Sequence, residues 1–195
     1  MLHSVERWIE HLRTLADPWC DSTVRIPAQG LAEPFRHVVI EPSVYAAPDD
    51  VADGEVQLWW ARCDPDLDVD DVVQRTPDGP LLSSNLYTAI EVWTDAELSA
   101  LHALWALARD RQRDDWMDRL CTARDWHLEH TQPDNATNRP WAFHVFLLDD
   151  RPECQHYAQT LLHNALATRG HPDPFSAWIM RDAAQLLETQ STPGQ

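Results

Sequence analysis

The spacing of apolar residues predicts a mainly α protein. Apolar side chains three and four positions apart mark a first helix over residues 4–16, which Pro18 ends. The same spacing continues from residue 82 to residue 190, so we expect an antiparallel array of about six helices there, joined by short turns. The expected helices span residues 86–93, 94–108, 113–131, 138–148, 152–170 and 174–189.

Two helix-start signals support these boundaries. Thr94 and Glu97 have the spacing of a capping box, which predicts that a helix begins at Thr94. Asp173 followed by Pro174 is typical of an N-cap and a first helical residue, and predicts the start of the last helix.

The segment of residues 17–80 has a different pattern. It contains eight of the fourteen prolines and only short apolar runs. We expect a partly β segment packed against the helices, with strands at His37–Ile40 and Val56–Trp60. The whole chain then forms a single domain. Its expected parts are residues 1–81 (the first helix and the irregular segment), 82–190 (the helical array) and 191–195 (a loose tail).

Composition and charge exclude several functions. The net charge is −17, which argues against nucleic acid and anionic membranes as partners, and the chain contains no lysine, which excludes Schiff-base and phosphate-loop lysines. Five glycines in all, without a glycine-rich loop, exclude the usual nucleotide cradles. No apolar run approaches the roughly 20 residues of a membrane helix, and the charged start is unlike a signal peptide.

These properties predict a cytoplasmic protein without a cofactor. The four cysteines lie far apart without a C-x-x-C pair, so we expect free thiols. The alternating aspartates of residues 64–71 fail the EF-hand pattern, because residue 69 is valine where the loop needs glycine. We expect a solvated acidic turn that leads into a short helix.

Polar side chains gather in residues 126–144, where one predicted helix turns into the next. The inner stripe of the 113–131 helix continues through His127 and His130. His144 is the only ionisable side chain between Trp141 and Leu148 in the following helix. In a tight antiparallel hairpin His127 and His144 would lie at similar heights, beneath the polar turn that joins the helices.

This corner has two non-catalytic interpretations. In the first, its histidines and amides are structural and satisfy buried backbone groups and indole N–H donors. In the second, they form a pocket for a small polar ligand such as a carboxylate, a sugar or a nucleoside. The expected ligand-binding residues are His127, His130, Asn135, Asn138, Arg139, Trp141 and His144.

An enzyme at the same corner is an alternative. A histidine would act as general base, a nearby carboxylate would orient it, and Arg139 would stabilise an anion together with Asn135. A metal-assisted hydrolase is the weaker version, with His127, His130 and His144 as ligands. A protein-interaction scaffold is a further alternative, and would expose Trp59 and Trp60. The candidate catalytic residues are His127, His144, Glu129 and Asp134.

Overall fold

The protein is a packed array of helices. The computed structural model describes residues 4–20, 46–51, 54–131, 137 and 139–191. The described residues contain no strand, and none of their helices is both long and apolar enough to span a membrane. The α-helices are α1 (Val5–Ala16), α3 (Glu55–Cys63), α4 (Asp70–Gln74), α5 (Ile90–Asp110), α6 (Asp114–His130), α7 (Phe143–Phe146), α8 (Pro152–Ala167) and α9 (Pro174–Ser191), with 3-10 turns η1 (Asp17–Trp19) and η3 (Ser84–Leu86).

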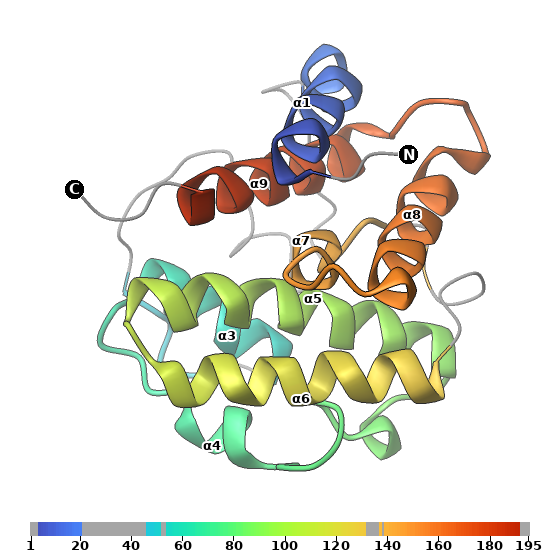
Figure 1. Ribbon diagram of the computed structural model, residues 1–195. Helices are drawn as coiled ribbons and strands as arrows, with labels where there is room; N and C mark the ends of the chain where they lie inside the picture. The colour runs from blue at the N-terminus through green and yellow to red at the C-terminus, as the bar shows by residue number, and fades with distance from the viewer. Residues whose placement is uncertain (1–3, 21–45, 52–53, 132–136, 138, 192–195) are drawn as a thin grey trace.

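Helix α5 is the central element. It packs against α3 and forms an antiparallel hairpin with α6, while α7 packs against α5, α8 and α9 (Figure 1). Nearly every side chain of α5 from Trp93 to Ala108 is buried, as expected for a helix that is apolar on most sides. Glu97 and His102 within this stretch therefore lie in the interior, and their partners come from other segments of the chain.

The chain ends form a second pair of helices. Helix α1 lies across α9, and its Trp8 side chain donates a hydrogen bond to Gln155 Oε1 of α8 at 3.2 Å (Figure 1). Ser4 caps α1 by accepting a hydrogen bond from the backbone N–H of Arg7. Asp173 caps α9 by accepting hydrogen bonds from the backbone N–H groups of Phe175 and Ser176, which confirms the predicted start of this helix.

The expected strand at Val56–Trp60 is wrong, because these residues lie in α3. A short apolar run does not distinguish a strand from a buried helix, and packing against α5 decides in favour of the helix. Trp59 and Trp60 are both buried, so the scaffold interpretation loses its main support. The other expected strand, His37–Ile40, and residues 192–195 of the expected tail lie outside the described residues.

Two helix boundaries also differ from the prediction. Thr94 is not an N-cap: α5 begins four residues earlier, and the Thr94 hydroxyl donates to the backbone carbonyl of Ile90. The expected helix over 138–148 is reduced to the single turn of α7, because Ala142 adopts a left-handed conformation with φ of 53°. The predicted hairpin between α6 and a long following helix therefore does not form.

Candidate functional site

His127 points inward, as predicted, and is fully buried. Its Nε2 atom lies 3.3 Å from Glu97 Oε1, and its Nδ1 atom lies 3.0 Å from the hydroxyl of Thr131. The imidazole packs between the indoles of Trp93 and Trp126. The carboxylate beside His127 thus comes from α5, thirty residues away in the sequence, and not from the predicted partner on its own helix.

Glu97 ties three segments together. Its carboxylate accepts hydrogen bonds from the backbone N–H groups of Leu81 and Leu82, both at 2.7 Å, in addition to the contact with His127. Glu97 and His127 have no exposed surface. A buried carboxylate that already accepts several hydrogen bonds acts as a structural tie, because no substrate reaches it.

His144 is also fully buried, but it belongs to a different cluster. Its ring lies edge-on to His102, with 4.4 Å between centroids, and edge-on to Trp105, at 4.9 Å. No contact joins His144 to His127 among the residues that the structure describes. Neither ring nitrogen of His144 has a hydrogen-bond partner in the described part of the chain.

His102 contacts an ion pair that crosses the core, and its burial keeps the imidazole neutral. The backbone N–H of Ala142 donates to its Nδ1 atom at 3.3 Å, so Nε2 carries the proton and donates to Asp182 at 3.0 Å. Arg62 binds the same oxygen of Asp182 at 2.9 Å. Although burial alone would raise the pKa of Asp182, Arg62 and His102 hold it below its ordinary value.

This second cluster could not be predicted from spacing, although its residues carry a weak signal. His102 stands in an otherwise apolar run of α5 from Ala100 to Ala108, and Asp182 interrupts the apolar stripe of α9. A polar residue at such a position predicts a buried partner without saying where in the sequence that partner lies. The two residues are eighty positions apart.

Acidification is expected to destabilise the fold through His144. Burial holds the pKa of His144 well below the ordinary value of 6.5, and because His102 lies beside it, protonating both rings would bring two like charges together. The unfolded chain binds this proton near the ordinary value, so stability that is fully present above about pH 6.5 is lost as the pH falls below it. For this one group we expect a loss of up to about 1.4 kcal/mol per pH unit.

Substituting His144→Phe should reduce this pH dependence by about one titrating group. Urea unfolding from about pH 8 to about pH 5 gives the free energy of unfolding as a function of pH. The slope of this function does not depend on how well phenylalanine packs. His163→Phe, at an exposed position on α8, is the matched control and should leave the slope unchanged. The same slope in His144→Phe as in the unchanged protein would contradict this account.

The remaining predicted histidine and its neighbour lie outside the core. His130 is exposed and stacks on Trp126, which corrects the expectation that it points inward. It is the last residue of α6, where the helix leaves the interior. Glu129 is exposed too and contacts no histidine among the described residues. The described part of the chain has no group of three residues able to hold a metal ion, and His127, His130 and His144 do not converge.

The predicted ligand-binding segment lies against α5, α8 and α9. The Thr137 hydroxyl donates to Asp95 at 2.5 Å, and its backbone carbonyl accepts from the Asn164 amide at 3.5 Å. The Arg139 guanidinium lies 4.4 Å above the ring of Phe175. Trp141 is fully buried, and packs against Trp59, His102 and Phe175. Three other predicted residues, Asp134, Asn135 and Asn138, lie outside the described residues.

A hollow borders this segment where α8 turns into α9. Its volume is about 280 Å³, and five of its six lining residues are polar. Asn164, which lines it, donates to Thr137, so the hollow adjoins the predicted segment. One wall is fixed by aromatic stacking, because the His171 ring lies flat on Trp19 with 3.7 Å between centroids. The lining residues are Asn164, Ala165, Thr168, Arg169, His171 and Asp173.

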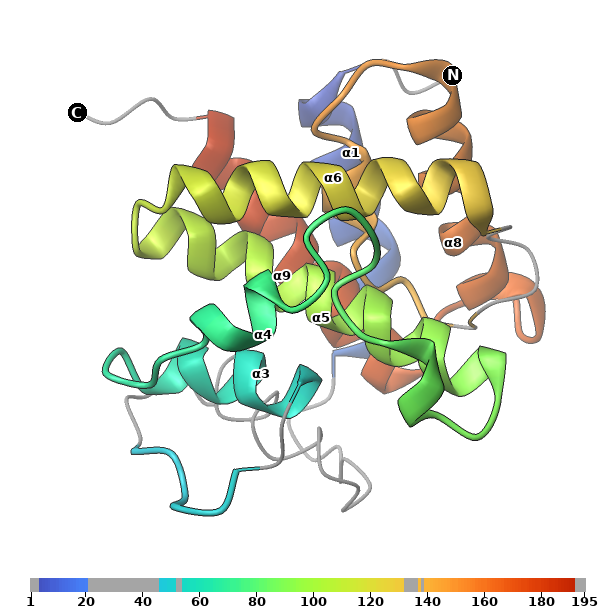
Figure 2. The ribbon, with the colours of Figure 1, turned by 90° about the horizontal axis from the view of Figure 1, so that it is seen from below.

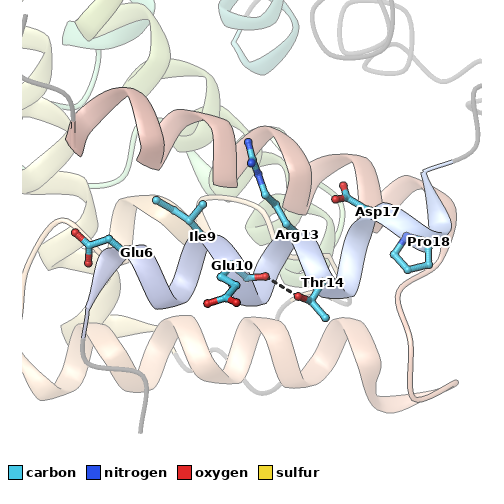
Figure 3. Close-up of a pocket in the computed structure, with 7 residues that line it drawn as sticks. All are labelled: Glu6, Ile9, Glu10, Arg13, Thr14, Asp17 and Pro18. Atoms are coloured by element: carbon cyan, nitrogen blue, oxygen red, sulfur yellow. Dashed lines mark hydrogen bonds between the residues drawn. The ribbon is translucent and has the colours of Figure 1, made fainter.

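A larger hollow of about 430 Å³ runs along α1, but its shape does not suit a ligand. Figure 3 shows that its lining side chains all stand on α1 and the turn that follows it. Thr14 donates to the backbone carbonyl of Glu10, and Arg13 pairs with Glu188 of α9 at 2.6 Å. One helix surface is convex, so it cannot surround a molecule from several sides as binding pockets do.

Glu55 is a buried carboxyl that the sequence analysis missed. It follows Gly54, whose φ of 82° suits glycine, at the start of α3. Burial raises the pKa of Glu55 well above its ordinary value, against the lowering effects of Ser99 and of the Arg139 charge. Burial therefore disfavours the charged form of this carboxyl, and the charge of Arg139 acts against that effect.

No protein-family model matches this chain, and neither the curated proteins nor the solved structures provide a significant match. The function of this protein is therefore inferred from the geometry of its side chains.

Proposed function

We propose that this protein binds a small polar ligand in the hollow between α8 and α9. The observation that carries the proposal is that an amide, a hydroxyl, a guanidinium, an imidazole and a carboxylate all line one hollow of about 280 Å³. A few convergent polar groups are what orients a small ligand in a binding site. The predicted ligand-binding segment adjoins the hollow through the hydrogen bond between Asn164 and Thr137.

The charges at the hollow favour a small zwitterion that carries a carboxylate. Arg169 is exposed and has no ion-pair partner among the described residues, so its guanidinium is available to a carboxylate. Asp173 caps α9 through its carboxyl group, which also lines the hollow and suits an ammonium group of the ligand. A ligand without net charge is also not repelled by a protein of net charge −17.

The placement of the histidines supports binding in preference to catalysis. His127 and His102 are enclosed in pairs with Glu97 and Asp182, which leaves no proton path to a substrate. His171 at the hollow donates from Nδ1 to the backbone carbonyl of Pro172 at 3.0 Å, so Nε2 is left to accept a hydrogen bond from a ligand. We also propose a cytoplasmic location, which the four free cysteines support.

Thermal denaturation with small probes tests the proposal. We expect glycine or γ-aminobutyrate to stabilise the protein more than acetate or ethylammonium, because each of the latter carries only one of the two charges. A probe concentration of about a hundred times its dissociation constant should add about 2.7 kcal/mol to the free energy of unfolding. Arg169→Ala should abolish this stabilisation without changing the stability of the protein alone.

Arg7→Ala is the matched control, because Arg7 is an exposed arginine on α1, away from the hollow. This variant should respond to the probes like the unchanged protein. The proposal fails if no probe stabilises the protein, or if Arg169→Ala and Arg7→Ala respond equally. If acetate alone stabilises the protein, the proposed binding function is supported, but the proposal that the ligand is a zwitterion is contradicted.

A further inference from the structure

The start of α5 and the turn before it expose an unusual amount of apolar surface. We call residues 84–92, from η3 through the first turn of α5, the apolar projection. Leu86 is 72% exposed, Ile90 60% and Val92 54%. The described residues contain one other exposed large apolar side chain, Trp19, and it stacks on His171. In Figure 2 the projection lies at the edge of the molecule.

Hydrogen bonds to buried residues fix the apolar projection to the core. Trp93, directly after it, donates from its indole to the backbone carbonyl of Leu82 at 2.9 Å. Glu97, one turn further along α5, binds the backbone N–H groups of Leu81 and Leu82. Both ends of the projection are thereby fixed to the core. Its apolar side chains are therefore held in fixed positions in contact with water, and covering them by a partner would be favourable.

The charges around the apolar projection select a cationic partner. Between Arg75 and Arg109 the chain has no arginine or lysine, while Asp78 and Glu91 are exposed carboxylates in that stretch. A second copy of this chain would bring another net charge of −17, so like-charge repulsion disfavours a homodimer through this surface. A basic partner gains both apolar burial and electrostatic attraction.

We propose that the apolar projection docks a cationic amphipathic helix of a partner protein. The apolar face of that helix covers Leu86 and Ile90, and its basic face lies toward Glu91. Such a helix recognises its target by apolar residues three and four apart, and its charges set the orientation. This surface lies on other elements than the hollow between α8 and α9, so the two proposals stand or fall separately.

A synthetic amphipathic helix with leucines on one face and lysines on the other tests the inference. Fluorescence anisotropy of the labelled peptide should show binding to the full chain, and the same peptide with glutamates in place of the lysines should not bind. Leu86→Ser/Ile90→Ser should weaken the affinity by at least about tenfold. Both positions are exposed, so the thermal unfolding of this variant should match that of the unchanged protein.

A second pair of variants tests the charge. Glu91→Gln should weaken binding and its salt dependence, whereas Glu153→Gln, an exposed carboxylate on the first turn of α8, should change neither. The inference is overturned if the lysine peptide does not bind, or if it binds Leu86→Ser/Ile90→Ser equally well. It is also overturned if sedimentation shows a dimer of this chain that Leu86→Ser/Ile90→Ser dissociates.

Discussion

Replacing Asp182 with alanine is expected to lower the free energy of unfolding by about 3–5 kcal/mol, a large part of the stability of a domain of this size. The carboxylate pairs with Arg62, whose side chain is 8% exposed, and accepts a hydrogen bond from fully buried His102. Without it, a buried cation and a buried N–H donor lose their partner. Urea unfolding at neutral pH measures the loss.

Glu188→Ala is the control for this measurement. Glu188 lies on the same helix as Asp182 and pairs with Arg13, but both of these side chains are substantially exposed, so its removal should cost no more than about 1 kcal/mol. Equal losses in Asp182→Ala and Glu188→Ala would show that the buried pair contributes no more than a surface pair.

Replacing Glu97 with alanine is expected to cost a similar amount, about 3–5 kcal/mol. The carboxylate is fully buried and accepts hydrogen bonds from two backbone N–H groups, of Leu81 and Leu82, as well as contacting His127. Each of these groups would be left buried without an acceptor, at a cost of about 1–3 kcal/mol per group. Equilibrium unfolding in urea gives the size of the effect.

Hydrogen exchange locates the same effect within the chain. In Glu97→Ala the amide protons of Leu81 and Leu82 should exchange faster than those in the middle of α5. Glu91→Ala, an exposed carboxylate on the same helix, should change stability by less than about 0.5 kcal/mol. Unchanged exchange at Leu81 and Leu82 would mean that Glu97 does not hold this turn.

Periodicity predicted the helices that have one apolar face and clear end signals. The first helix, α6, α8 and α9 all begin or end within a few residues of their predicted boundaries. The buried stripe of α6 was predicted as far as His127, and the prediction failed only at the last residue, His130. These elements are set by neighbours three and four positions apart, which a sequence shows directly.

The partners of the buried polar groups could not be predicted from the sequence. Glu97 was interpreted as the end of a capping box, whereas its carboxylate binds the preceding turn and a residue of α6. The left-handed Ala142 had no signal at all, because glycine or asparagine usually marks such a position. Contacts across the core depend on which helices pack together, and spacing along one helix does not contain that information.

The tie between α5 and α9 has a consequence for how the chain is made. Ribosomes release residues in order, and Arg62 precedes Asp182 by 120 positions. Until α9 has been synthesised, Arg62 and His102 of the nascent chain have no carboxylate of Asp182 to pair with in the core. Packing the earlier helices around these two groups would bury polar side chains without partners, which costs free energy. We therefore expect the native core to form late in translation.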